Sequence, residues 1–256
     1  MILDQIAELK AGEVEEDKKR RPLSIIKEDL KNPPPKRDFK KAVTDRDCAI
    51  IAEVKRKSPS KGTLRNDFDP LEIAHIYERN GAAAISVLTD EPFFEGRKEF
   101  LPRIRERVSL PLLRKDFIID PYQVYETKRL GADAVLFIAR LLKKGLASYV
   151  RLAKALDLFP LVEVHSEEEL DLALAAGAEL IGINNRDLAT FETGLQTSLN
   201  LASLVPKSRI VIAESGIQSR KDVEILLQAG IHAFLIGETL MKADDLAEKL
   251  RELAGR

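Results

Sequence analysis

The sequence contains no tryptophan, and aromatic residues make up only 5% of its 256 residues. Aliphatic side chains must therefore supply most of the core, which suits the buried strands of a parallel sheet. A single cysteine, Cys48, excludes an intramolecular disulfide framework and is typical of a reducing compartment. Because Cys48 opens an expected strand, we interpret it as a small core residue rather than a reactive thiol.

Long apolar runs and an excess of one charge are also missing. No segment approaches the roughly 18 apolar residues of a membrane span, and residues 1–30 contain nothing that resembles a signal peptide. Lys and Arg number 41 against 42 Asp and Glu, which gives a formal net charge of -1. This balance offers no support for a nucleic-acid partner or an acidic membrane surface. We therefore expect a cytoplasmic protein with no nucleic-acid partner and no membrane partner.

The sequence does contain apolar segments that end abruptly in charged or amide residues. In AIIAEVKRKSPSK (49–61), alternation places Glu53 and Lys55 on one face at the carboxyl end of an expected strand, 49–54. For a single strand this pattern is also explained by charges that are merely solvated. The pattern recurs, however, in RKD (114–116), EVH (163–165), NNR (184–186) and ESG (214–216). We expect these strand ends to converge on one site.

A repeat centred on glycine indicates how the strands are arranged. At positions 81, 131, 177 and 230 a helical segment gives way to glycine and then to an apolar strand, and each glycine suits a left-handed helix end. Four further strands are expected at 49–54, 111–113, 160–164 and 209–213. Helices alternate with them, with capping signals at Asp69-Pro70 and Asp120-Pro121 and a capping box from Ser166 to Glu169. Eight strands alternating with helices predict an α/β fold of the (β/α)8 TIM barrel type.

A doubly wound open sheet is the alternative architecture. It would carry a G-x-G-x-x-G turn after its first strand, and the segment KRKSP (55–59) is unlike such a turn. The barrel therefore remains the favoured prediction.

Residues 1–45 differ in character from the rest of the chain. Ile2, Ile6 and Leu9 have helical spacing, a run of mixed charges follows, and three prolines at 33–35 form a stiff connector. We expect an N-terminal helical extension over 1–45 and a catalytic (β/α)8 barrel over 46–256. The apolar stripe of the extension is predicted to lie across the barrel mouth as a lid; the alternatives are a plug for the bottom of the barrel or a loosely attached tail.

Barrel active sites lie at the carboxyl ends of the strands, where these charged residues fall. A lysine and a glutamate held across a partly dry pocket form an acid and base pair, and burial is expected to lower the lysine pKa and raise the glutamate pKa. His165 shares a face with Glu163 but lies further out, so a direct role for it is less favoured. No metal-ligand spacing is present, and no metal is predicted. The residues expected around the mouth are Lys55, Lys115, Glu163, Asn184 and Arg186.

Glycines follow two further expected strands, in AESGI (213–217) and LIGE (235–238). Glycine allows the backbone to approach a ligand closely, and the loops after the last two strands of a barrel often bind phosphate. One such glycine alone can mark a simple turn, but the pair favours a phosphate site. The segment DEPFFEG (90–96) is either a mobile loop with Phe94 as an aromatic wall, or a loop that this side chain anchors.

Seven motifs, in this order, resemble those of the indole-3-glycerol phosphate synthase family: IIAEVKRKSPSKG, SVLTDEPFFEG, PLLRKDFIID, LVEVH, IGINNRDL, IAESGI and IGETLM. The resemblance covers nearly the whole chain. It implies a carboxy-lyase of tryptophan biosynthesis that closes the ring of 1-(2-carboxyphenylamino)-1-deoxyribulose 5-phosphate. Carbon dioxide and water are lost, indole-3-glycerol phosphate is formed, and no cofactor is needed. The implied partners are this small sugar-phosphate substrate and, as a further option, other enzymes of the tryptophan pathway.

The same resemblance implies residue roles. Lys115 matches a general acid and Glu163 a general base, whereas Lys55, with Glu53 beside it, matches a lysine that contacts substrate carboxylate and phosphate; how the two lysines divide the proton transfers is left open. Glu214 matches a carboxylate near the dehydration centre. The implied catalytic residues are Lys115, Glu163, Lys55, Glu53, Asn184 and Glu214. Those implied for substrate binding are Arg186, Ser58, Phe94 and Phe117, and those for phosphate are Ser215, Gly216, Gly237 and Glu238, the last two through backbone N–H groups.

Two other functions stay open on the residues alone. One is an aldolase that uses Lys115 or Lys55 as a Schiff-base nucleophile on a sugar phosphate. The other is a non-catalytic barrel that serves as a partner-binding subunit. Retention of both Lys115 and Glu163 argues against the second, because a structural barrel needs no inward-facing ion pair.

Overall fold

The computed structural model describes residues 2–187 and 190–256, and within them eight parallel strands form a closed barrel. In chain order these strands are β1 (Ala49–Val54), β4 (Ala84–Leu88), β5 (Leu112–Lys115), β6 (Ala134–Ile138), β7 (Phe159–Val164), β8 (Leu180–Asn184), β9 (Ile210–Glu214) and β10 (Ala233–Ile236). Each pairs with its neighbour in sequence, and β10 closes on β1. The predicted (β/α)8 barrel is confirmed. A short hairpin, β2 (Lys57–Ser58) with β3 (Gly62–Thr63), follows β1 and was not predicted.

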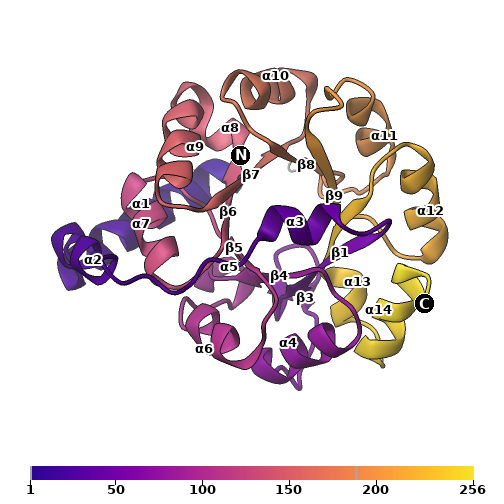
Figure 1. Ribbon diagram of the computed structural model, residues 1–256, viewed down its shortest axis with the longest axis horizontal. Helices are drawn as coiled ribbons and strands as arrows, with labels where there is room; N and C mark the ends of the chain where they lie inside the picture. Colours follow the sequence, from indigo (N-terminus) through magenta and orange to yellow (C-terminus); the bar gives the residue numbers. More distant parts are fainter. Residues whose placement is uncertain (1, 188–189) are drawn as a thin grey trace.

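Helices surround the barrel (Figure 1). They are α4 (Pro70–Arg79), α5 (Glu91–Phe94), α6 (Phe100–Arg107), α7 (Pro121–Arg129), α8 (Ala139–Leu142), the 3-10 turn η1 (Lys143–Gly145), α9 (Leu146–Ala155), α10 (Glu167–Ala175), α11 (Gln196–Ala202), α12 (Arg220–Gln228), α13 (Glu238–Met241) and α14 (Leu246–Ala254). Asp69 and Asp120 cap α4 and α7 as expected. At α10 the predicted capping box is only half formed: Ser166 accepts from the backbone N–H of Glu169, but the Glu169 carboxylate accepts from the backbone N–H of His165.

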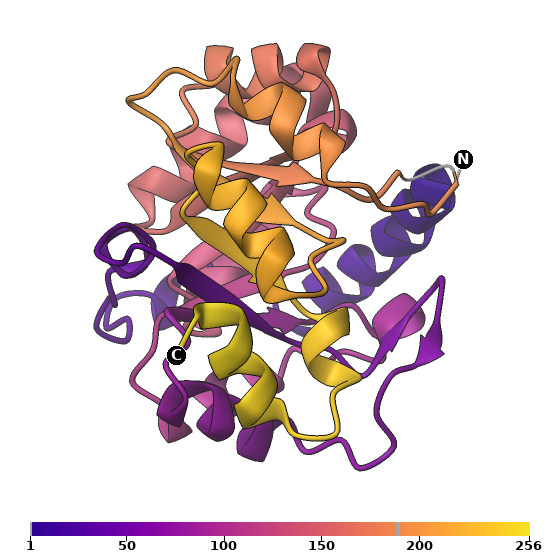
Figure 2. The same cartoon turned by 90° about the vertical axis from the view of Figure 1, so that its right-hand side faces the viewer.

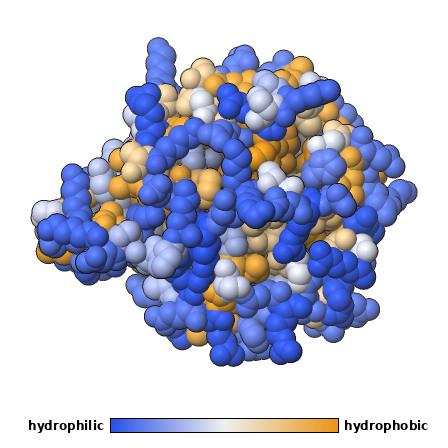
Figure 3. All heavy atoms as spheres, viewed as in Figure 1, coloured by the Kyte–Doolittle hydropathy of each residue, from blue (hydrophilic) through white to orange (hydrophobic). Residues whose placement is uncertain are grey.

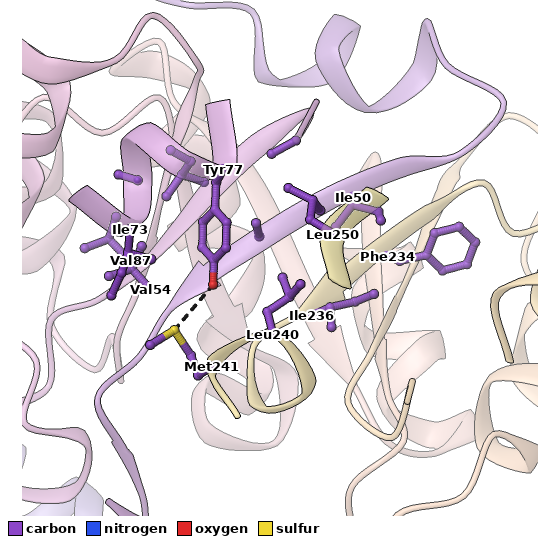
Figure 4. Packing of buried hydrophobic residues seen from close by; sticks show 14 of the residues in the cluster. Ile50, Val54, Ile73, Tyr77, Val87, Phe234, Ile236, Leu240, Met241 and Leu250 are labelled. Atoms are coloured by element: carbon purple, nitrogen blue, oxygen red, sulfur yellow. Dashed lines mark hydrogen bonds between the residues drawn. The ribbon is translucent and has the colours of Figure 1, made fainter. Parts of the chain in front are cut away.

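Strand alternation divides the core into two layers. Inside the barrel, residues such as Ile51, Leu113 and Leu161 form one buried aliphatic cluster. Residues on the other strand faces pack against the helices. Figure 4 shows this outer layer where α4 meets β1 and α13, and there the Tyr77 hydroxyl donates to Met241 Sδ at 3.3 Å. Because side chains fill the barrel below, the open space lies at its carboxyl end.

The N-terminal segment reaches both ends of the barrel through α1 (Ile2–Arg20), α2 (Leu23–Asp29) and α3 (Phe39–Thr44). In α3, Phe39 and Val43 are buried in the interior cluster with residues from the amino ends of the strands, and Figure 1 shows α3 crossing the middle of that face. Figure 2 shows α1 at the opposite end, beside the segment that follows β8. The segment therefore plugs the bottom and also reaches the mouth. The division of the chain into 1–45 and 46–256 stays a prediction.

The surface around α3 is mainly hydrophilic, with apolar atoms visible between the helices (Figure 3). In the described part of the chain, no helix combines the length and the apolar character needed to span a bilayer. Met1 and Leu188, which belong to the predicted extension and to the motif IGINNRDL, lie outside the described residues.

Candidate active site

The barrel mouth holds a cavity of about 1140 Å³. Because inward-facing residues alternate along parallel strands, the last inward position of each strand faces this space. The predicted residues that line it are Glu53, Lys55, Ser58, Phe94, Lys115, Phe117, Glu163, Asn184, Arg186, Glu214, Ser215, Gly216, Gly237 and Glu238. Residues that are far apart in sequence are thus brought together as expected, whereas their chemical roles stay predictions.

Lys115 lies at the centre of a buried charge cluster. Its Nζ is 2.9 Å from Glu163 Oε2 and 3.4 Å from Glu214 Oε2. Asn184 donates from Nδ2 to Glu163 Oε1 at 3.1 Å, which fixes the other carboxylate oxygen. One cation from β5 therefore sits between two carboxylates from β7 and β9.

This cluster corrects the expected directions of the pKa shifts. Burial alone lowers the pKa of Lys115, but the neighbouring carboxylates, Glu163 foremost, raise it above its ordinary value. Burial raises the pKa of Glu163, yet Lys115 and His165 outweigh burial and lower it to about 2. The expectation of a lowered lysine pKa and a raised glutamate pKa is therefore wrong for this pair. The raised carboxyl is Glu214, where burial and the charges of Glu163 and Glu53 raise the pKa to about 8 against the attraction of Lys115.

Two glycines make room for the buried carboxylates. A Cβ at Gly182, in the middle of β8, would overlap the Glu214 carboxylate. A Cβ at Gly237 would overlap the Glu53 carboxylate. Gly182 was missed at the sequence level, although an isolated glycine inside a strand is a known signal of close approach by another group. Gly237 was assigned to phosphate binding only, and the structure adds this packing requirement.

A second ion pair and the loops after β9 and β10 form another side of the mouth. Lys55 Nζ lies 2.6 Å from Glu53 Oε1. Ser215 and Gly216 both adopt left-handed backbone conformations, with φ of 64° and 74°. The Glu238 carboxylate is held by Arg186 Nη2 at 2.9 Å and by Lys242 Nζ at 2.7 Å. Two cations thus offset the negative charge of Glu238 beside the predicted phosphate site.

Apolar residues wall the cavity. The rings of Phe94 and Phe117 are 6.1 Å apart, and both line the space. Phe94 thus packs against Phe117, as expected of an anchoring side chain, and also forms part of the cavity wall, as expected of an aromatic wall. The buried Ser58 Oγ has no hydrogen-bond partner among the described residues, so it is available to a ligand.

Helix α1 contributes to the same cavity. Leu3 and Ile6 line it, but Leu9 is 55% exposed, so the predicted stripe is wrong at Leu9; the side chain of Ile2 lies outside the described part of the chain. Lys10 was not predicted from the sequence; its buried ammonium lies 2.8 Å from Asp90 Oδ2 and 3.2 Å from Asp116 Oδ1. No spacing signal could have found it, because its partners are some 80 and 106 residues away.

Comparison with known proteins identifies the family. The family model described as indole-3-glycerol phosphate synthase matches residues 3–253. The chain belongs to the indole-3-glycerol phosphate synthase family. Among its relatives, the indole-3-glycerol phosphate synthase of Alkaliphilus metalliredigens is 48% identical over 99% of this chain and 98% of its own length. That of Legionella pneumophila strain Paris is 46% identical over 98% of both chains.

Membership of the indole-3-glycerol phosphate synthase family confirms the predicted enzyme class. The chain is a carboxy-lyase of tryptophan biosynthesis that binds a sugar-phosphate-like substrate. Among solved structures, 3-hexulose-6-phosphate synthase from Salmonella typhimurium has a TM-score of 0.67 at 16% identity, covering 81% of this chain and 97% of that one. This likeness concerns the fold alone.

Proposed function

We propose that the cavity closes the indole ring with Lys115 as general acid and Glu163 as general base, acting on 1-(2-carboxyphenylamino)-1-deoxyribulose 5-phosphate. The observation that carries this proposal is the position of the Lys115 ammonium between Glu163 and Glu214 in a buried cluster. A cation beside the substrate carbonyl oxygen stabilises the negative charge that develops there as the ring carbon attacks. Its raised pKa keeps Lys115 protonated for this step.

The neighbouring carboxylates divide the remaining proton transfers. Glu163 is ionised at neutral pH and can accept a proton, and a substrate that draws Lys115 away increases its basicity. Glu214, with its raised pKa, can carry a proton near neutrality and donate it to the leaving hydroxyl group. Carbon dioxide leaves from the aromatic carboxylate and water from the sugar part, so the ring closes without a redox partner.

The rest of the cavity orients the substrate. Lys55 offers a cation to the substrate carboxylate, and the backbone at Ser215, Gly216 and Gly237 offers a cradle for the phosphate. The rings of Phe94 and Phe117 supply an apolar wall for the aromatic part. Two anchored anionic ends and a wall between them fold a flexible substrate into the geometry of ring closure.

Helix α1 helps to exclude water in this proposal, because the apolar side chains of Leu3 and Ile6 line the cavity. Replacing both with Ser should raise KM for the full substrate, while the melting temperature should fall only slightly. The matched control is Leu9→Ser, on the same helix but exposed. An unchanged KM and kcat in the double variant would exclude the lid.

The activity is tested directly by incubating the purified chain with the carboxyphenylamino substrate. Indole fluorescence should appear together with carbon dioxide, and both signals should be lost in Glu163→Gln. Borohydride treatment with sugar phosphates should trap no adduct, since Lys115 is held charged and a Schiff-base aldolase needs a neutral amine. No fluorescence with the wild-type chain, or a trapped adduct, would refute the proposal. A cytoplasmic location and association with other enzymes of the pathway also remain predictions.

A further inference from the structure

Beside the Glu163 carboxylate lies His165, to which the proposed function gives no role. Its side chain is 7% exposed, and among the described residues it is not part of the cavity lining. His165 follows the last residue of β7, and its ring contacts the Glu163 carboxylate, which does line the cavity. Any effect it has on the reaction is therefore exerted through Glu163.

One side of the His165 ring is held by a carboxylate. Glu169 Oε2, from α10, lies 3.2 Å from His165 Nδ1 and also accepts from the His165 backbone N–H at 2.9 Å. Arg140, from α8, donates from Nε to the other oxygen of Glu169 at 2.6 Å. Because Arg140 favours the ionised form of Glu169, Nδ1 of His165 carries a proton.

The other ring nitrogen faces Glu163. His165 Nε2 lies 3.4 Å from Glu163 Oε1, and it is buried with no hydrogen-bond partner in the described part of the chain. If Nε2 were unprotonated, its lone pair would face an ionised carboxylate at this distance, which is repulsive. A proton on Nε2 turns the contact into an attraction and gives the ring a positive charge between two carboxylates.

The charged groups around the ring come from five elements. Glu163, Glu169 and the more distant Glu214 favour the protonated ring, whereas burial opposes it and is the largest single influence. The cations Lys115 and Arg140 pair with two of these glutamates, Glu163 and Glu169 respectively. The net result is a pKa of His165 above its ordinary value.

We propose that His165 is a positioning residue for Glu163: the protonated ring, anchored by Glu169, holds the Glu163 carboxylate in place and keeps it ionised when substrate draws Lys115 away. Without this second cation, Glu163 would become an unpaired buried carboxylate at that stage and would take up a proton from solvent, which disables a general base. The consequence for turnover rests on the proposed function of Glu163, whereas the charge coupling between the two residues does not.

The coupling is measured without substrate by nitrogen-15 NMR of the imidazole rings in the full chain. The sequence contains three histidines, so His165→Gln identifies the signal of His165 by its loss. Its titration should lie above the ordinary histidine value of about 6.5 in the wild type, and Glu163→Gln should lower it by about one pH unit or more. Glu167→Gln, an exposed change on the same helix, should leave it unchanged. An equal His165 pKa in the wild type and Glu163→Gln would overturn the proposal.

A kinetic experiment is a second, independent test of the positioning role, and it does not depend on whether Glu163→Gln folds. His165→Gln should lower kcat several-fold with little change in KM, and its kcat should lose the decline at alkaline pH that accompanies deprotonation of His165. His232→Gln, an exposed change near the amino end of β10, should match the wild type. A variant with unchanged kcat and pH profile would refute the positioning role. If the wild type shows no turnover, the proposed function fails, while the NMR titration still decides the coupling.

Discussion

Replacing Lys10 tests whether the N-terminal helix is fixed at the mouth by electrostatics. Its buried ammonium joins α1 to Asp90, which caps α5, and to Asp116, which follows Lys115. The variant Lys10→Met keeps the length and apolar stem of the side chain but removes the charge. It removes the ion pair of Asp90 Oδ2, a buried atom that has no hydrogen-bond partner among the described residues, whereas Asp116 keeps Arg114 at 2.9 Å.

The magnitude follows from these distances. At 2.8 and 3.2 Å, with an effective dielectric constant of about 20, the two contacts correspond to attractions of about 6 and about 5 kcal/mol. Burial of the ammonium offsets much of this attraction, but removing it leaves the buried Asp90 carboxylate without a counter-ion, and breaking a buried pair in this way costs about 3–5 kcal/mol. In a chain of this size the melting temperature should fall by about 10 °C. Because Asp90 caps the helix that carries Phe94, KM should rise as well.

The free energy of unfolding is measured by urea titration, alongside KM and kcat. Lys19→Met is the control, since its pair with Glu16 is exposed, and it should leave the free energy of unfolding unchanged. The double variant Lys10→Met with Asp90→Asn should recover part of the loss, because the amide needs no counter-ion. A single Lys10→Met variant within about 1 kcal/mol of the wild type, or no recovery in the double variant, would refute the reasoning.

Three further predictions concern the charge cluster. Lys115→Ala should lower kcat by about a hundredfold or more, as expected for a positioned general acid, and leave the circular dichroism spectrum unchanged; near-normal kcat would exclude that role. The pKa of Glu214 is raised from 4.5 to about 8 on folding, so the stability that its protonated form contributes is lost as pH rises through this window. The variant Glu214→Gln cannot ionise, so its free energy of unfolding in urea titrations should gain on that of the wild type between pH 5 and pH 9. The same difference in free energy of unfolding at pH 5 and at pH 9 would contradict the shift. Gly182→Ala places a methyl group against Glu214 and should destabilise the fold by about 1–3 kcal/mol with reduced kcat, whereas Gly194→Ala, with open space around it, should do neither.

Local sequence rules determined the barrel. The alternation in AIIAEV, the glycines at the helix ends and the capping aspartates are each readable within a few residues, and together they predicted strands that the structure contains. The position of the site followed from the same rules. Parallel strands with an inward-facing period of 2 must bring Lys115, Glu163 and Glu214 to one end of the barrel, whatever their separation in sequence.

Only the tertiary structure decided the contacts between those residues. The pKa of Lys115 is raised rather than lowered because two carboxylates lie within 3.4 Å of its Nζ, and such distances depend on strand stagger, which sequence alone does not give. The path of α1 shows the same limit. Its helical spacing suggested Leu9 as a buried residue, but the helix is oriented by Lys10 through the distant Asp90 and Asp116. Interactions of this kind arise only after the barrel has brought remote segments together, and they determine which residues of the mouth are charged, buried and paired.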